Sequence, residues 1–217
     1  MGLVPPVPDL LELLRAQADA NGALLIFDEV ISGFRVARGG YQKLAGVTPD
    51  LTMFGKIVGG GLPAAAYAGR RELMEHVAPA GEVYQAGTLS GNPPAMAAGL
   101  ATLARLDEAA YAQLARTTSL LAEGLEAAAE DAGVEVSVVS RCGLLTVFFA
   151  AEAPSDFEAA KACDLRSHAA WCRALLRHGV YPPPSQFEAW FPSLAHDDAV
   201  VERTLDAVGR AFQEIAR

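Results

Sequence analysis

A short, wholly apolar run that ends abruptly at an acidic residue constrains the fold of this chain most. The run is Ala23–Phe27, and it stops at Asp28. A strand that is apolar on both faces belongs inside a sheet that helices cover, which favours a parallel α/β sheet. A second expected strand, 50–54, stops at Gly55-Lys56. Two charged side chains therefore follow buried strands at their carboxyl ends, where open α/β sheets bind ligands.

Segments on either side of these strands in the sequence have apolar residues at helical spacing. One expected helix spans about 9–20, where Asp9 can cap the first turn, and another spans about 93–106, where two prolines suit the first turn. The composition changes near residue 107. Beyond it we expect strands over 134–139 and 144–149, with helices over about 111–132, 155–178 and from 197 onward. Strands between helices make an α+β unit, so we expect two domains, 1–106 and 107–217.

The helix expected over 155–178 carries signals at both ends. Ser155 and Glu158 have the spacing of a capping box, which predicts the first turn, and Gly179 predicts the end. Three possible metal ligands lie along it: Cys163, His168 and Cys172. At ~100° per residue, however, the two cysteines lie about 180° apart on one helix, and two ligands on one face do not close a metal site. We therefore expect no metal centre.

The charge balance excludes several classes of partner. The chain of 217 residues has 17 basic and 26 acidic side chains, a formal net charge of −9. A nucleic-acid-binding protein needs a basic face, and so does a protein that docks on anionic membranes. No run approaches the ~18 apolar residues of a membrane span, and the first ten residues do not resemble a signal peptide. Three cysteines fit a reducing compartment, so we expect a cytoplasmic location.

Asp28 and Lys56 form the constellation with the clearest chemistry. A carboxylate and an amine at neighbouring strand ends suit pyridoxal phosphate, because the acid keeps the ring nitrogen protonated and the lysine forms a Schiff base with the aldehyde. Val30 lies two residues beyond Asp28, so it can point the same way and pack on the ring. The alternative from the residues alone is a solvated surface lysine and an ordinary turn aspartate.

Four blocks of sequence carry a resemblance to a known family. They are LLIFDEVISGFR (24–35), PDLTMFGKIVGGGLPAAAYAGR (49–70), YQAGTLSGNPPAMAAG (84–99) and PPPSQFEAWFPSLAH (182–196). In order, they resemble the glutamate-1-semialdehyde 2,1-aminomutase family, a class III aminotransferase group of fold type I that uses pyridoxal phosphate. The resemblance extends over essentially the whole chain, but only over the C-terminal half of the family's sequence.

The resemblance implies a role for each matched residue. Asp28 would pair with the pyridine nitrogen, Val30 would back the ring, and Lys56 would be the Schiff-base lysine that also moves protons. Gly87 and Thr88 would reach the cofactor phosphate of the partner subunit in a homodimer.

Two further positions matched by the resemblance carry less information. Glu188 matches a glutamate near the substrate, although an acid in a loop is usually only solvated. Ser32 stands where threonine is common, which keeps the hydroxyl.

The implied reaction converts glutamate-1-semialdehyde to 5-aminolevulinate for tetrapyrrole biosynthesis, with the pyridoxamine form of the cofactor donating its amine. Residues 1–106 would be the C-terminal part of the large cofactor-binding domain, and 107–217 the small α+β domain. Without the family's other half, the sheet would expose an edge and an apolar face. The alternatives are a fragment of another class III aminotransferase, or a non-catalytic remnant that only associates with full-length subunits.

Overall fold

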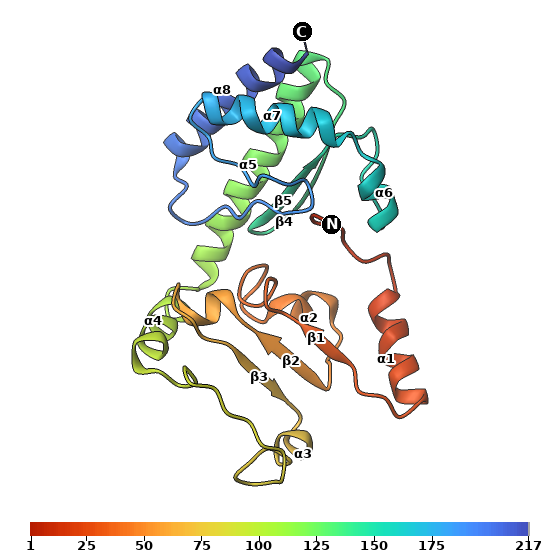
Figure 1. Ribbon diagram of the computed structural model, residues 1–217, viewed down its shortest axis with the longest axis vertical. Helices are drawn as coiled ribbons and strands as arrows, with labels where there is room; N and C mark the ends of the chain where they lie inside the picture. Colours follow the sequence, from red (N-terminus) through yellow and green to blue (C-terminus); the bar gives the residue numbers. More distant parts are fainter. Residues whose placement is uncertain (217) are drawn as a thin grey trace. The chain divides into compact units, whose positions relative to one another are not determined.

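Residues 1–216 are described by a computed structural model, and they divide into two units (Figure 1). The first unit is Pro8–Ala110. The second combines Met1–Val7 with the chain from Tyr111 onward. The N-terminal segment joins the second unit through its backbone N–H groups: Gly2 N donates to the backbone oxygen of Phe187 at 2.8 Å, and Leu3 N donates to the side-chain Oγ1 of Thr146 at 2.9 Å.

A three-stranded sheet of order β1-β2-β3 forms the centre of the first unit. Its strands are β1 (Ile26–Asp28), β2 (Leu51–Phe54) and β3 (Ala66–Gly69). β1 and β2 are parallel, with Asp28 opposite Met53, which confirms the predicted parallel pair. β3 runs antiparallel to β2 and was not predicted, because the short sequence Ala-Tyr-Ala-Gly has no run of β-branched residues.

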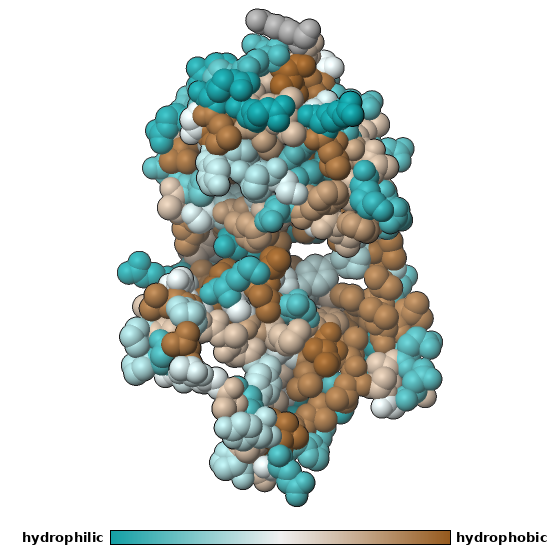
Figure 2. Space-filling model, viewed as in Figure 1, coloured by the Kyte–Doolittle hydropathy of each residue, from teal (hydrophilic) through white to brown (hydrophobic). Residues whose placement is uncertain are grey.

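The prediction that β1 and β2 are buried on both faces is wrong for this chain. Ile26 is 50% exposed, and Met53 on the neighbouring strand is 41% exposed. These side chains share one face with Tyr67 of β3, since the register places Met53 opposite Tyr67. Thr52, on the other face, is buried. The strands are apolar on this face, as the sequence indicates, but the described residues do not cover it (Figure 2).

Five helical segments accompany the sheet in the first unit. They are α1 (Leu10–Ala20), α2 (Gly40–Ala45), the 3-10 helix η1 (Lys56–Gly59), α3 (Arg71–Met74) and α4 (Pro93–Leu103). The two helices expected from the sequence correspond to α1 and α4. The expected cap of α1 is wrong, because Asp9 adopts a left-handed backbone and makes no capping hydrogen bond with its side chain. Asn92 caps α4, accepting from Ala95 N at 3.0 Å.

The second unit packs helices against an antiparallel pair of strands, β4 (Ser137–Arg141) and β5 (Leu144–Phe148). β4 begins and ends later than the predicted strand 134–139. The helices are α5 (Glu108–Ala132), α6 (Phe157–Ala162), α7 (Leu165–Arg177) and α8 (Asp198–Ile215). Fully buried side chains from α5, β5, α7 and α8 form the core, including Leu125, Leu145, Trp171 and Phe212.

The single helix predicted over 155–178 is two helices. Cys163 has an extended backbone after α6, and Asp164 then caps α7 by accepting from the backbone N–H groups of Arg166 and Ser167. The cap of α6 is Asp156, which accepts from Ala159 N at 2.8 Å, so the predicted capping box at Ser155 is also wrong. An aspartate that caps a helix can break a periodic pattern without glycine or proline.

None of the described helices is both long enough and apolar enough to cross a membrane.

Candidate active site

Asp28 and Lys56 stand where the two parallel strands of the first unit end. Asp28 is the last residue of β1 and lies opposite Met53, three residues before Lys56. Both charged residues are exposed. The fold therefore places a carboxylate and an amine at one edge of the sheet, which we call the carboxyl edge.

The backbone at Lys56 has a rare conformation. Gly55 is extended, and Lys56 then adopts φ 49°, in the left-handed region, as the first residue of η1. A non-glycine residue there costs on the order of 1–3 kcal/mol, and such strain gathers at functional sites. The abrupt turn ends β2 and keeps Lys56 at the carboxyl edge.

Val30 packs closely against the backbone of β2. A Cβ atom placed on Gly55 would lie 3.1 Å from Val30 Cγ1, so glycine allows the contact. The backbone N–H of Val30 donates to Asp28 Oδ1 at 3.0 Å. The Asp28 carboxylate is therefore tied to the turn that carries Val30.

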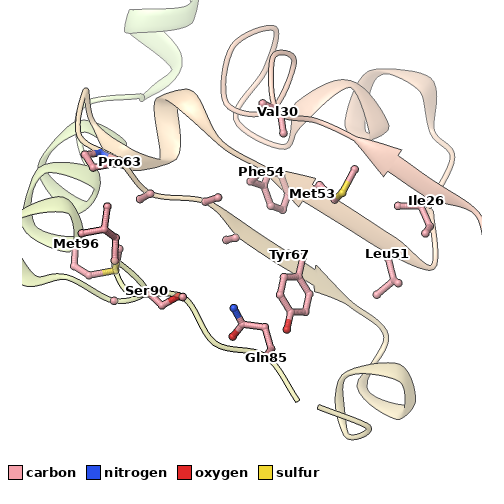
Figure 3. Close-up of a pocket in the computed structure, with 16 residues that line it drawn as sticks. Ile26, Val30, Leu51, Met53, Phe54, Pro63, Tyr67, Gln85, Ser90 and Met96 are labelled. Carbon is pink, nitrogen blue, oxygen red and sulfur yellow. The ribbon is translucent and has the colours of Figure 1, made fainter. Parts of the chain in front are cut away.

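A hollow of about 970 Å³ lies over the open face of the sheet (Figure 3). Strand side chains such as Ile26, Met53 and Tyr67 form one wall, and residues of the segment 85–91 form another. Val30 and Gly87 line the hollow, whereas Asp28, Lys56 and Thr88 are not among its lining residues. The walls are mostly apolar, so the hollow borders the candidate site and does not itself resemble a phosphate cup.

Gly87 and Thr88 lie on an exposed turn before α4. Ser90 N donates to Gly87 O at 3.0 Å, which closes the turn. Asn92 anchors it, because its side-chain Nδ2 donates to Leu89 O at 2.8 Å while its oxygen caps α4. The turn belongs to the same unit as Asp28 and Lys56.

Glu188 belongs to the other unit, and its side chain is exposed. Its backbone is fixed by Glu188 N donating to Ser185 O and by Thr146 Oγ1 donating to Glu188 O. The structure therefore does not bring Glu188 into the unit that holds Asp28 and Lys56.

Glu29 is a residue that the sequence analysis missed. It directly follows Asp28, and it is only 2% exposed. Its carboxylate accepts hydrogen bonds from Ser32, Tyr41 and Gln42. An available signal was the hydroxyl at position 32, three residues beyond the acid.

Cys163, His168 and Cys172 of the second unit are the residues considered above as metal ligands. Among residues 1–216, no group of three or more His, Cys, Asp and Glu side chains could hold a metal ion. His168 and Cys172 do share a face of α7, with the Cys172 Sγ atom 3.7 Å from the His168 ring nitrogens. Burial lowers the pKa of His168 to about 4 and raises the pKa of Cys172 to about 11. Both groups are therefore neutral at pH 7.

Comparisons with known proteins agree on one family. The profile described as "Aminotransferase class-III" matches residues 1–212. The chain is 52% identical over 217 residues to a glutamate-1-semialdehyde 2,1-aminomutase of Desulfatibacillum aliphaticivorans. The aligned region covers 99% of this chain and 51% of that protein. The chain thus spans about half the length of the curated relatives it matches.

Solved structures give the same result for the fold. An omega-transaminase from Sphaerobacter thermophilus matches with a TM-score of 0.91 and 33% identity, over 99% of this chain and 49% of that chain. A glutamate-1-semialdehyde-aminomutase from Pseudomonas aeruginosa PAO1 matches with a TM-score of 0.81 and 24% identity, over 99% of this chain and 49% of that chain. The second likeness concerns the fold alone. Both neighbours extend over about twice the described length.

Proposed function

The chain belongs to the class III aminotransferase family, and we propose that it serves the pyridoxal-phosphate-dependent isomerisation of glutamate-1-semialdehyde to 5-aminolevulinate, in tetrapyrrole biosynthesis. The observation that carries the proposal is the placement of Asp28 and Lys56 at the ends of adjacent parallel strands. The substrate is inferred from the relatives that are about half identical to the chain.

The residues at the carboxyl edge fit the cofactor, which is pyridoxal 5'-phosphate or its pyridoxamine form. The cofactor has a ring nitrogen, an aldehyde or amine, and a flat apolar face. Asp28 supplies an acceptor for the ring N–H, Lys56 supplies an amine, and Val30 supplies methyl groups for the ring face. The close contact of Gly55 with Val30 supports this fit, because it fixes the valine beside the strand that leads to Lys56.

When bound, the cofactor supplies an electron sink for the substrate carbon that exchanges its amine. Asp28 keeps the ring nitrogen protonated through its carboxylate, whose Oδ1 also accepts from Val30 N. Lys56 Nζ would hold and move protons at the substrate carbon, the work of a positioned general acid and base.

Part of the proposal concerns a second subunit. We propose that Gly87 and Thr88 bind the cofactor phosphate of the partner in a homodimer. Thr88 is exposed on a turn that Asn92 anchors, so its hydroxyl and the neighbouring backbone are accessible to another chain. Hydroxyl and N–H donors suit a phosphate dianion.

Other parts of the proposal concern larger regions. Residues 1–106 are proposed as the C-terminal part of the large cofactor-binding domain and 107–217 as the small domain, with Glu188 near the substrate and the protein in the cytoplasm. Activity requires the rest of the family's fold, because the chain spans about half of its relatives. The family's other half is proposed to supply most of the phosphate cup and the groups that bind the substrate.

A second candidate function is that of another class III aminotransferase, which transfers an amine from a separate donor. The likeness to the omega-transaminase, at 33% identity, favours it. A third possibility is a non-catalytic chain that only associates with full-length subunits. The three differ in product: 5-aminolevulinate without an added donor, an amine that depends on a donor, or neither.

The first test asks whether Lys56 holds the cofactor. The purified chain is mixed with pyridoxal phosphate, treated with borohydride and analysed by absorbance and peptide mass, beside Lys56→Ala and Lys43→Ala. Lys43 is exposed on α2 of the same unit and serves as the control. We expect borohydride to fix the cofactor on Lys56 in the parent and in Lys43→Ala only. Equal labelling of all three proteins would contradict the proposal.

The second test addresses the reaction. The chain is combined with the N-terminal half of the Desulfatibacillum aliphaticivorans relative and given glutamate-1-semialdehyde, with and without an amino donor. We expect 5-aminolevulinate without a donor. Turnover that requires a donor would favour the second candidate, and no turnover despite association would favour the third.

A further inference from the structure

Glu29 is a buried carboxylate that the proposed roles leave unused. It lies between Asp28 and Val30 and is 2% exposed. Moving a charged group from water into the protein interior costs on the order of several kcal/mol, unless hydrogen bonds to the group compensate for the lost hydration. Its hydrogen bonds therefore indicate what it holds in place.

The donors around the carboxylate come from two segments, the turn after β1 and the start of α2. Oε2 accepts from Ser32 Oγ at 2.6 Å and from Tyr41 N at 2.8 Å. Oε1 accepts from Gln42 N at 2.8 Å and from Gln42 Nε2 at 3.4 Å. Gln42 Nε2 also lies 3.4 Å from Thr52 Oγ1 on β2. The carboxylate thus joins the turn after β1 to the start of α2, and the Gln42 side chain extends the network to Thr52 in β2.

The backbone of Glu29 is held as firmly as its side chain. Glu29 N donates to Met53 O, and Gly33 N donates to Glu29 O, both at 2.9 Å. Two glycines leave room for the carboxylate and the carbonyl oxygen of Glu29. A Cβ on Gly40, whose φ is +70°, would lie 2.5 Å from Glu29 Oε1, and one on Gly33 would lie 2.5 Å from Glu29 O.

We propose that Glu29 is a positioning residue for the carboxyl edge. By holding residue 29 at both backbone groups and both carboxylate oxygens, the network fixes the turn in which Val30 N donates to Asp28 Oδ1. It thereby sets the direction of the Asp28 carboxylate and the place of the Val30 side chain. The inference rests on the proposed function in one respect, namely that the Asp28 carboxylate faces the cofactor ring.

A simpler role would be to cap α2 alone. In that case, loss of the carboxylate would expose only the Tyr41 and Gln42 amides. A positioning role also exposes the Val30 amide, whose hydrogen bond reports the direction of the Asp28 carboxylate. Amide hydrogen exchange separates the two roles and needs no cofactor.

The variants are Glu29→Gln, Ser32→Ala and Ser32→Thr, with Asp50→Asn as the control. Asp50 is another buried carboxylate of the same unit, but it lies at the amino end of β2 and accepts from Leu25 N at 2.7 Å. We expect Glu29→Gln to speed exchange at Val30, Tyr41 and Gln42 about tenfold or more, the size of one lost hydrogen bond to a charged group. Asp50→Asn is expected to speed exchange at Leu25 and leave Val30 unchanged.

The serine variants keep the test decisive if Glu29→Gln does not fold. Ser32→Ala removes one of the four hydrogen bonds, and we expect a smaller acceleration at Val30, which Ser32→Thr restores to the parent rate. Acceleration at Tyr41 and Gln42 alone, or equal acceleration at Val30 by Asp50→Asn, would overturn the proposal.

A cofactor titration distinguishes this proposal from the proposed function. Each variant is combined with the N-terminal half of the Desulfatibacillum aliphaticivorans relative, as in the test of the reaction. We expect pyridoxal phosphate to bind the parent and Ser32→Thr equally, and Glu29→Gln about tenfold more weakly. Equal binding by Glu29→Gln and the parent would contradict the positioning role. No binding by the parent in the presence of the N-terminal half would instead refute the proposed function, while the exchange rates would still decide what Glu29 holds.

Discussion

At the residue scale, Gly55 shows how closely the backbone of β2 approaches Val30. Its backbone is extended, a conformation that any residue can adopt, so the tight contact with Val30 and not the dihedral angle opposes a side chain here. We expect Gly55→Ala to displace Val30 and to destabilise the first unit by about 1–3 kcal/mol, the usual cost of overpacking. Urea unfolding would measure the loss, and pyridoxal phosphate titration would detect weaker binding.

Gly209→Ala is the matched control for that prediction. Gly209 lies within α8, and nothing stands within 4 Å of the Cβ it would gain. Alanine in a helix interior is favoured over glycine by about 1 kcal/mol, so this variant should be stabilised. If Gly55→Ala were as stable as the parent and bound the cofactor equally, the contact with Val30 would not matter.

His168 gives the second unit a defined dependence on pH. Burial lowers its folded pKa to about 4, below the ordinary value of about 6.5. The unfolded chain therefore binds more protons between these values, so the stability is complete above pH 6.5 and is lost as the pH falls toward 4. Between pH 8 and pH 5 we expect a loss of about 2 kcal/mol from this residue.

The measurement is urea unfolding at several pH values, followed by the fluorescence of Trp171, whose ring centroid lies 6.1 Å from that of His168. His168→Gln should flatten the pH dependence of the free energy of unfolding by that amount. His76→Gln, which changes an exposed histidine of the other unit, is the control. If the free energy of unfolding varied with pH equally in His168→Gln and the parent, His168 would not be the source of the pH dependence.

At the element scale, the start of α6 tests which of two adjacent residues caps a helix. Asp156 accepts from Ala159 N, whereas Ser155 lies one position earlier and is exposed. Loss of a capping side chain costs about 1 kcal/mol. Thermal unfolding should therefore show destabilisation for Asp156→Ala and little change for Ser155→Ala. The reverse ranking would support the capping box expected from the sequence.

The elements that the sequence predicted well were those with local signals. The parallel strands were found because each apolar run stops beside a charged residue, and the same pattern predicted Asp28 and Lys56 as candidate site residues. β3 was missed because an antiparallel edge strand of small residues depends on its partner for its conformation. The break at Cys163-Asp164 was missed because neither glycine nor proline marks it.

Glu29 shows why part of the candidate site escaped prediction. Its hydrogen-bond partners lie 3, 12 and 13 residues further along the chain, a separation with no periodic pattern. The sequence shows an acid after a strand, and such a residue is usually solvated. Only the fold reveals that Gly40 leaves room for the carboxylate beside α2.

At the scale of the whole molecule, the open face of the sheet is the feature that most affects behaviour in solution. Ile26, Met53 and Tyr67 are each 40–50% exposed on this face. An edge strand and a contiguous apolar surface favour association with other chains. Because the relatives are about twice as long, we expect the family's other half to cover this face, and the chain alone to self-associate.

Ile26→Thr tests this expectation, since threonine keeps the β-branched shape of the strand residue while reducing its apolar surface. Sedimentation velocity over a range of concentrations should show weaker self-association for Ile26→Thr than for the parent. Leu176→Gln is the control, because Leu176 is 51% exposed on α7 of the other unit. If Leu176→Gln abolished association and Ile26→Thr did not, the second unit would carry the contact and the sheet face would have to be covered in another way.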